Sequence, residues 1–339
     1  GAHAPQSAWI GTFHGVCLRL LKRFSAEAGL RKSFRVVDPS AQRELLLAAG
    51  VVWDSDDGDL TDIIGRWKDS MTTPDEADAA AARSGNSVLR AAAAHYGTYE
   101  AELARAGDLD FADLVTKALS AVRLSPEVGK FVADRLPHVL VGEFQDVNRS
   151  QVEFLQAMAG CGSSVWAVAD DDQALYGWRG GDVRYTVDFP RHFPGAARYT
   201  LETNYRCDPA VVAAANALIS RNARRVPKSL KPARPHRNGT SVRVRSFATE
   251  REEAEWIAGE IARFAAGGAD TSRVAVLFRT ASVTPAIQQA LEARQVEFSL
   301  SGTQSFWDLP EVTAVGEVLL AVETGEEGRA ARFKGGRDL

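Results

Sequence analysis

The sequence has few cysteines and no long apolar run. Its three cysteines, Cys17, Cys161 and Cys207, are odd in number and far apart, which excludes a disulfide framework and a cysteine metal knuckle. No run reaches the roughly 18 apolar residues that a membrane span requires, and the N-terminal residues carry no signal for secretion. The cytoplasm is therefore the expected compartment.

The chain also lacks an excess of positive charge. A net charge of −4 and a pI near 6.0 give no global field for binding a polyanion, so nucleic-acid binding would have to come from local patches. Apolar residues make up 45% and charged residues 25%, which is ordinary for a globular protein. A length of 339 residues predicts about two domains, with a third if one is small.

The first part of the chain is predominantly helical in pattern. Residues 7–11 predict a short strand and turn, followed by a helix with apolar positions between Val16 and Phe24. Residues 38–135 are rich in alanine, with a helix start at Asp38-Pro39-Ser40 and an acidic loop at 54–59. We interpret this region as a helical insertion.

Two short apolar runs, 139–141 and 165–169, are typical of buried parallel strands. Each run ends in a polar, acid-rich turn, and ligands of doubly wound sheets bind at the carboxyl ends of strands. A second α/β unit is predicted from Val242, with strands at 242–244 and 274–278 and helices spanning 254–264 and 285–293. The fold class is therefore α/β with a parallel sheet.

The first polar turn presents Glu143, Gln145 and Asp146. A carboxylate at this place could orient a water molecule for attack on a γ-phosphate. Taken alone, the segment is more typical of a solvated turn after a core strand.

The second turn, residues 170–181, contains an aromatic pair followed by arginine and two glycines. Tyr176, Trp178 and Arg179 could stack on bases and contact a phosphate, although Tyr176 is also typical of a core aromatic residue. In a third segment, 201–206, Arg206 could reach an anion bound across a cleft.

A basic stretch, residues 221–245, carries seven arginines and two lysines with no acid. Such a connector could lie along phosphates, and it could equally be a solvated linker.

These segments together resemble the superfamily 1A DNA helicases of the UvrD/Rep/PcrA type. Thr12-Phe13-His14 is similar to motif Ia, 109–114 (LDFADL) to a segment of the helical 1B insertion, and 141–151 to the Walker B motif. Residues 170–180 resemble motif III almost residue for residue. Further similar segments are 201–206 (LETNYR), 275–280 (AVLFRT) and the Phe306-Trp307…Glu311 segment, and all of them occur in family order.

The resemblance implies RecA-like parallel-sheet domains of the P-loop NTPase type, and it implies a role for each matching residue. Glu143 would position the attacking water, Gln173 would sense the γ-phosphate, and Arg206 would act as an arginine finger. Tyr205 would stack on adenine, and Asp146 would lie in the cofactor site. The implied DNA-binding residues are Thr12, Phe13, His14, Tyr176, Trp178, Arg179, Arg279 and Thr280.

The implied activity is ATP-dependent 3′-to-5′ movement on single-stranded DNA, used in DNA repair or replication. The implied cofactors are ATP and Mg²⁺, and the implied partners are single-stranded DNA, duplex junctions and DNA-repair proteins. The implied location is the bacterial cytosol or nucleoid.

The family pattern also divides the chain into five parts. These are a partial domain 1A without its phosphate loop (1–37), the insertion 1B (38–135), the remainder of 1A (136–200), the first part of domain 2A (201–325) and a loose tail (326–339).

Two departures from the family pattern concern the ATP site. No GxxxxGK[ST] phosphate loop occurs in the 339 residues, and Gly142 occupies the place of the metal-binding aspartate of Walker B. Three hypotheses follow: a segment of a working helicase, a degenerate module that binds single-stranded DNA or a partner without hydrolysis, or the motor part of a helicase–nuclease. The first two hypotheses predict little or no ATP turnover by this chain alone.

Overall fold

A computed structural model describes residues 8–51, 60–235 and 242–300. The chain divides into two compact units, the first ending at Val242 and the second beginning at Arg243. No helix among the described residues is long and apolar enough to span a membrane.

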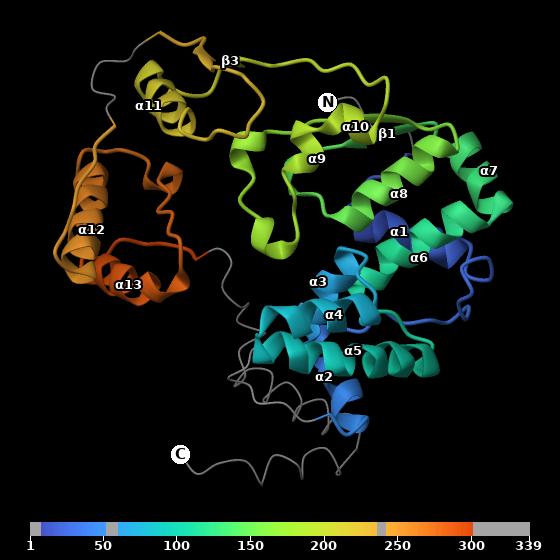
Figure 1. Ribbon diagram of the computed structural model, residues 1–339. Helices are drawn as coiled ribbons and strands as arrows, with labels where there is room; N and C mark the ends of the chain where they lie inside the picture. Colours follow the sequence, from blue (N-terminus) through green and yellow to red (C-terminus); the bar gives the residue numbers. More distant parts are fainter. Residues whose placement is uncertain (1–7, 52–59, 236–241, 301–339) are drawn as a thin grey trace, which may run out of the picture. The chain divides into compact units, whose positions relative to one another are not determined.

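The first unit is mostly helical and contains two pairs of short strands (Figure 1). Its helices are α1 (Phe13–Arg23), α2 (Pro39–Ala48), α3 (Leu60–Asp69), α4 (Pro74–Ser84), α5 (Ser87–Ala106), α6 (Phe111–Leu124), α7 (Pro126–Arg135), α8 (Arg149–Gly160), α9 (Arg184–Val187), α10 (Phe189–His192) and α11 (Pro209–Ile219). Its strands are β1 (His138–Val141), β2 (Ser164–Ala167), β3 (Thr203–Asn204) and β4 (Lys231–Pro232). The second unit contains α12 (Glu250–Ala266) and α13 (Thr284–Glu292).

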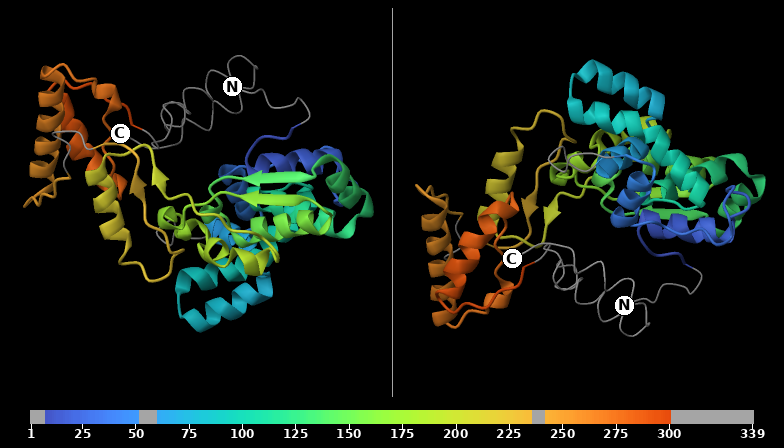
Figure 2. Two further views of the ribbon diagram at one scale, coloured as in Figure 1. Left: turned by 90° about the horizontal axis from the view of Figure 1, so that it is seen from above. Right: turned by 90° about the horizontal axis from the view of Figure 1, so that it is seen from below.

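Strands β1 and β2 pair in parallel and are joined through α8, as the two apolar runs predicted (Figure 2). Val139 pairs with Val165 and Leu140 with Trp166, so alternate side chains point to opposite faces. One face packs against Phe144, Val152 and Leu155 in a buried cluster. The other face leaves Leu140, Trp166 and Val168 exposed, at 79%, 63% and 68% of their surfaces.

The helix starts follow from local capping chemistry. Asp38 accepts a hydrogen bond from the N–H of Ala41, which confirms the predicted start at Asp38-Pro39-Ser40. Asp110 and Asp113 form a capping box at the start of α6. Helix α6 then packs between α1 and α8, and its apolar side fills the largest core cluster of the first unit.

A buried ion cluster ties helices α3 and α5 to the start of α6. The ammonium of Lys68 lies 2.7 Å from Glu100, 2.7 Å from Asp110 and 2.8 Å from Asp113. Burial alone would lower the pKa of Lys68, but the three carboxylates outweigh it and raise that pKa. Burial, and then the negative charges of Asp110 and Glu100, raise the pKa of Asp113 to about 6, although the Lys68 ammonium acts to lower it.

The neighbouring Asp69 makes the stability of this region depend on pH. Burial raises the pKa of Asp69 from 3.8 to about 6, and its Oδ1 atom has no hydrogen-bond partner among the described residues. The folded protein therefore binds a proton more tightly at this group than the unfolded chain does. The stability that Asp69 contributes is present below about pH 4 and is lost as the pH rises through 6.

We therefore expect Asp69→Asn to stabilise the protein at pH 7.5 relative to the parent, and to lose this advantage at pH 4. The difference between 3.8 and about 6 corresponds to about 3 kcal/mol. Urea unfolding at the two pH values measures it. Asp78→Asn, at an exposed position of α4, is the matched control. Equal gains at both pH values for Asp69→Asn would contradict the assignment.

Several predicted strands are not formed. Residues 242–244 and 274–278 have no strand pairing, and neither do 8–11, the part of the predicted N-terminal strand that the structure describes. An apolar run favours extended backbone, but a strand also needs a neighbour for its hydrogen bonds. The helices predicted beside them are formed as α12 and α13. The acidic loop at 54–59, the Phe306…Glu311 segment and the tail 326–339 lie outside the described residues.

Candidate functional site

The turn after β1 exposes Glu143 in a strained backbone conformation. Glu143 has φ 51° and ψ 40°, in the left-handed region that residues other than glycine rarely adopt. The next residue, Phe144, is fully buried, and its N–H donates to the carbonyl of Val168 at 3.0 Å. Phe144 also packs against Phe189 and Phe193. This anchor fixes the turn and leaves the Glu143 carboxylate at the end of the strand.

Gln145 joins the two polar turns. Its side-chain Nε2 donates to Glu143 Oε2 at 2.7 Å, and its Oε1 accepts from the N–H of Asp170 at 3.0 Å. Gln145 is only 2% exposed, whereas its partner Glu143 is exposed, so the bridge runs from the buried amide to the surface of the turn. The position of Gln145 between two acids is the one sequence signal for this bridging role.

Asp146 follows in the same turn. Its Oδ1 atom is buried without a hydrogen-bond partner among the described residues. Burial, and then the negative charge of Glu143, raise the pKa of Asp146.

The turn after β2 carries Gln173. Its Nε2 donates to Asp170 Oδ2 at 2.6 Å, and Asp170 also accepts from the N–H of Asp172 at 3.2 Å. The carboxyl ends of β1 and β2 thus bring Glu143, Gln145 and Gln173 into one hydrogen-bonded group. Arg206 does not join it, because no hydrogen bond or ion pair among the described residues links this arginine to either turn.

Tyr176 and Trp178 stand next along the chain as an aromatic pair. Their ring centroids lie 6.5 Å apart, and 44% and 57% of their surfaces are exposed. The segment closes onto the first turn, since a Cβ atom on Gly181 would lie 3.1 Å from the carbonyl oxygen of Asp146. A side chain at 181 would therefore crowd backbone carbonyl oxygens, and this close approach favours glycine there. The backbone of Arg179 belongs to the short 3₁₀ turn Gly177–Arg179.

The three residues of the predicted motif Ia begin α1. Thr12 caps this helix by accepting from the N–H of Gly15 at 3.2 Å. Phe13 is half-buried against two core clusters, and His14 packs edge-on against Phe111, with ring centroids 5.8 Å apart. Burial lowers the pKa of His14. Phe13 and His14 thus have packing roles in addition to any contact with DNA.

The remaining predicted site residues lie in two other places. Tyr205 and Arg206 are exposed after β3, where Asn204 Oδ1 accepts from the N–H of Arg206 at 3.0 Å. Arg279 and Thr280 are exposed in the second unit, where the Thr280 hydroxyl lies 2.9 Å from that of Ser282.

Four bases of the stretch 221–245, namely Arg224, Arg225, Lys228 and Lys231, pair with acids of the chain itself. Arg224 pairs with Asp188, and Lys231 pairs with Glu202. Arg225 and Lys228 pair with the acids of the second polar turn. Hydrogen bonding to Arg225 lowers the pKa of Asp172. A count of charges could not show this, because the partners lie far away in the sequence.

The residues present supply only part of a site for Mg²⁺ and ATP. The carboxylates of Glu143 and Asp146, with the unpartnered Oδ1 atom, suit the water shell of a cation. Gly142 contributes no oxygen, and the sequence has no glycine-rich loop with a lysine for the phosphates. The residues present therefore do not form a complete site for ATP and Mg²⁺.

Both parts of the chain match families of known proteins. Residues 2–194 match the family described as UvrD/REP helicase N-terminal domain, and residues 199–320 match the UvrD-like helicase C-terminal domain. The chain is 29% identical over 315 residues to the ATP-dependent DNA helicase PcrA of Staphylococcus epidermidis, and 29% identical over 309 residues to that of Staphylococcus aureus.

These matches cover 91% and 90% of the chain but only 42% of each relative. The chain thus spans less than half the length of these relatives. The N-terminal match implies a RecA-like fold, and the parallel pair β1 and β2 is consistent with such a sheet. With more than half of its residues in the N-terminal match alone, the chain belongs to the UvrD/REP helicase family.

Proposed function

We propose that the chain is a segment of an ATP-dependent 3′-to-5′ single-stranded-DNA translocase or helicase that serves DNA repair or replication. The observation that carries the proposal is the hydrogen-bonded group at the carboxyl ends of β1 and β2, where Gln145 connects Glu143 to the Asp170 turn. This edge of a parallel sheet is where nucleotides bind in α/β folds.

In this proposal, the missing part of the nucleotide site is supplied from outside these 339 residues. Glu143 would then position the attacking water, and Gln173 would sense the γ-phosphate. Tyr205 would stack on adenine, Arg206 would stabilise charge on the phosphates, and Asp146 would help to hold the metal. Single-stranded DNA passes along the wall formed by Tyr176 and Trp178, with Arg179 linking that wall to the nucleotide.

The other proposed DNA contacts come from the start of α1 and from the second unit. They are Thr12, Phe13, His14, Arg279 and Thr280. The proposed domains remain 1A (1–37 and 136–200), 1B (38–135) and 2A (201–325).

Gly142 favours a second candidate function, a module that binds single-stranded DNA without hydrolysing ATP. Without a carboxylate at this position, one group that would bind Mg²⁺ and its water shell is missing. Since Mg²⁺ neutralises the charge of the phosphates, its weaker binding would slow hydrolysis. Both candidates predict DNA binding, and both predict weak ATP turnover by this chain alone.

The test is ATP hydrolysis by the purified chain, with and without single-stranded DNA, beside Gly142→Asp. Among the described residues other than its two chain neighbours, no atom lies within 4 Å of a Cβ added at Gly142, so this part of the structure accommodates the aspartate. We expect little or no turnover in either version, because neither has the phosphate-loop lysine, and retained binding of single-stranded DNA in both.

Glu143→Gln is the control for contaminating ATPase, since it removes the proposed base. DNA-stimulated turnover that disappears in Glu143→Gln would mean that a substitute for the phosphate loop exists. Failure of all versions to bind single-stranded DNA would contradict both candidate functions.

A further inference from the structure

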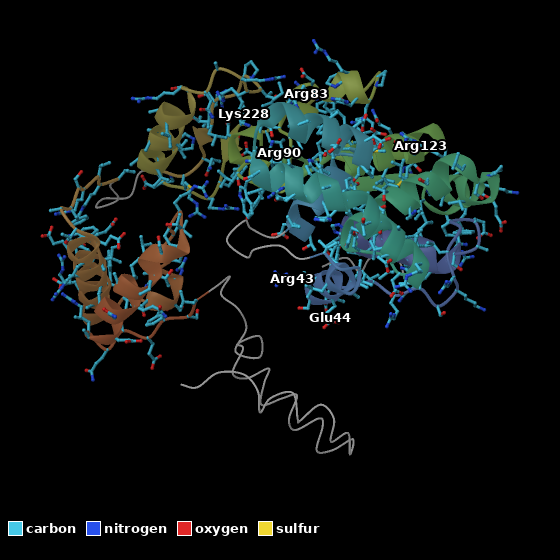
Figure 3. All side chains as sticks on the ribbon, turned by 60° about the horizontal axis from the view of Figure 1, so that its bottom comes forward. Arg43, Glu44, Arg83, Arg90, Arg123 and Lys228 are labelled. Atoms are coloured by element: carbon cyan, nitrogen blue, oxygen red, sulfur yellow. The ribbon has the colours of Figure 1, made fainter. Side chains whose placement is uncertain are left out.

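Five charged residues form an ion cluster between the second polar turn and the segment after α11. The Arg225 guanidinium donates two hydrogen bonds to Asp172, at 2.8 Å from Nε and 2.6 Å from Nη2. Lys228 Nζ lies 2.7 Å from Asp170 and 3.2 Å from Asp172, and it also contacts Asp171. Figure 3 labels Lys228 on this segment. We call these five residues the Asp170–Lys228 cluster.

The cluster joins the two family domains. Its three acids lie within residues 2–194, which match the N-terminal domain, and its two bases lie within 199–320, which match the C-terminal domain. The backbone takes part as well, because the N–H of Val226 donates to Asp171 at 2.7 Å. The two basic side chains are only 16% and 11% exposed. They are therefore committed to these acids and poorly placed to contact a DNA phosphate.

A path of hydrogen bonds leads from the cluster to the candidate site. Asp170 accepts a hydrogen bond from Lys228 Nζ at its Oδ1 atom and another from Gln173 Nε2 at its Oδ2 atom. The N–H of Asp170 donates to Gln145, which in turn donates to Glu143. The position of Asp170 thus sets the position of Gln173, and Lys228 holds Asp170. The same turn continues into Tyr176 and Trp178.

We propose that Arg225 and Lys228 are positioning residues, through which the C-terminal domain fixes the turn that carries Gln173 and the aromatic pair. The inference rests on the proposed function for the use of that turn in binding nucleotide and DNA. It assigns to these two cations an indirect role, in place of the phosphate contact that a basic connector suggests.

The experiment compares the full chain with Lys228→Met, Lys228→Arg and a control, Lys231→Met. Lys231 lies three residues along the chain, is exposed and pairs only with Glu202 among the described residues. Hydrogen exchange by mass spectrometry follows the peptides covering 168–178 and 225–230. Fluorescence anisotropy measures the affinity for a labelled oligo(dT) at several KCl concentrations.

For Lys228→Met we expect faster exchange in both peptides and an affinity for oligo(dT) reduced about three- to tenfold. The slope of log affinity against log salt should stay unchanged, because no phosphate contact is removed. Lys228→Arg should restore both the exchange and the affinity, and Lys231→Met should leave the exchange of 168–178 as in the parent.

A salt slope smaller by about one for Lys228→Met, with unchanged exchange, would make Lys228 a direct phosphate contact and overturn the inference. Unchanged exchange and unchanged affinity would overturn it too. If the parent chain fails to bind oligo(dT), the proposed function fails, while the exchange of 168–178 still decides whether Lys228 holds the turn.

Discussion

Replacing Lys68 with methionine should lower the free energy of unfolding by about 3–5 kcal/mol at pH 7.5. Lys68 is 4% exposed and is the shared partner of Glu100, Asp110 and Asp113. Removing the ammonium leaves the three carboxylates together without their cation, and an uncompensated buried charge costs about this much. Urea unfolding followed by circular dichroism measures the loss.

The loss should be smaller at pH 5, where the unpaired carboxylates can take up protons. Arg105→Met is the matched control, because Arg105 pairs with Glu102 at 2.6 Å but is 71% exposed. An exposed pair contributes about 1 kcal/mol or less. Equal losses for the two variants would show that the Lys68 cluster does not hold α3, α5 and α6 together.

Replacing Trp178 with alanine should weaken the binding of single-stranded DNA by about 1–3 kcal/mol, the usual size of a base-stacking contact. Trp178 is more than half exposed and lies beside Tyr176, at the end of a turn that is fixed to the rest of the site. Titration of a labelled oligo(dT) by anisotropy, at one fixed salt concentration, measures the change.

Trp166→Ala is the control for this variant. Trp166 is also an exposed tryptophan of the first unit, but it lies on the apolar face of the β1–β2 sheet. We expect its affinity for oligo(dT) to equal that of the parent. An unchanged affinity in Trp178→Ala would remove the aromatic pair from the DNA interface.

The elements that the sequence predicted are those governed by local rules. The helix start at Asp38 depends on a cap and a proline within three residues, and β1 and β2 are short apolar runs that end in polar turns. Residues 242–244 and 274–278 have similar runs without forming strands, because pairing depends on neighbours elsewhere in the chain.

The candidate site also combines features that local sequence patterns predict with contacts that they do not. The sequence places Glu143 and Gln173 after two parallel strands, and the structure brings their turns together. The contact between Lys228 and Asp170 joins residues that are 58 positions apart. No local pattern predicts which acid a lysine selects over such a distance, so the sequence alone left the basic stretch as either a phosphate-binding connector or a solvated linker.

The backbone conformation of Glu143 sets the stability of the fold against the presence of a carboxylate at this position. A left-handed conformation costs a residue with a Cβ atom about 1 kcal/mol or more, and glycine avoids the cost. Substitution by glycine would thus make the fold more stable while removing the carboxylate. Keeping the Glu143 carboxylate therefore lowers the stability of the fold, as expected of a side chain that the proposed function uses for chemistry.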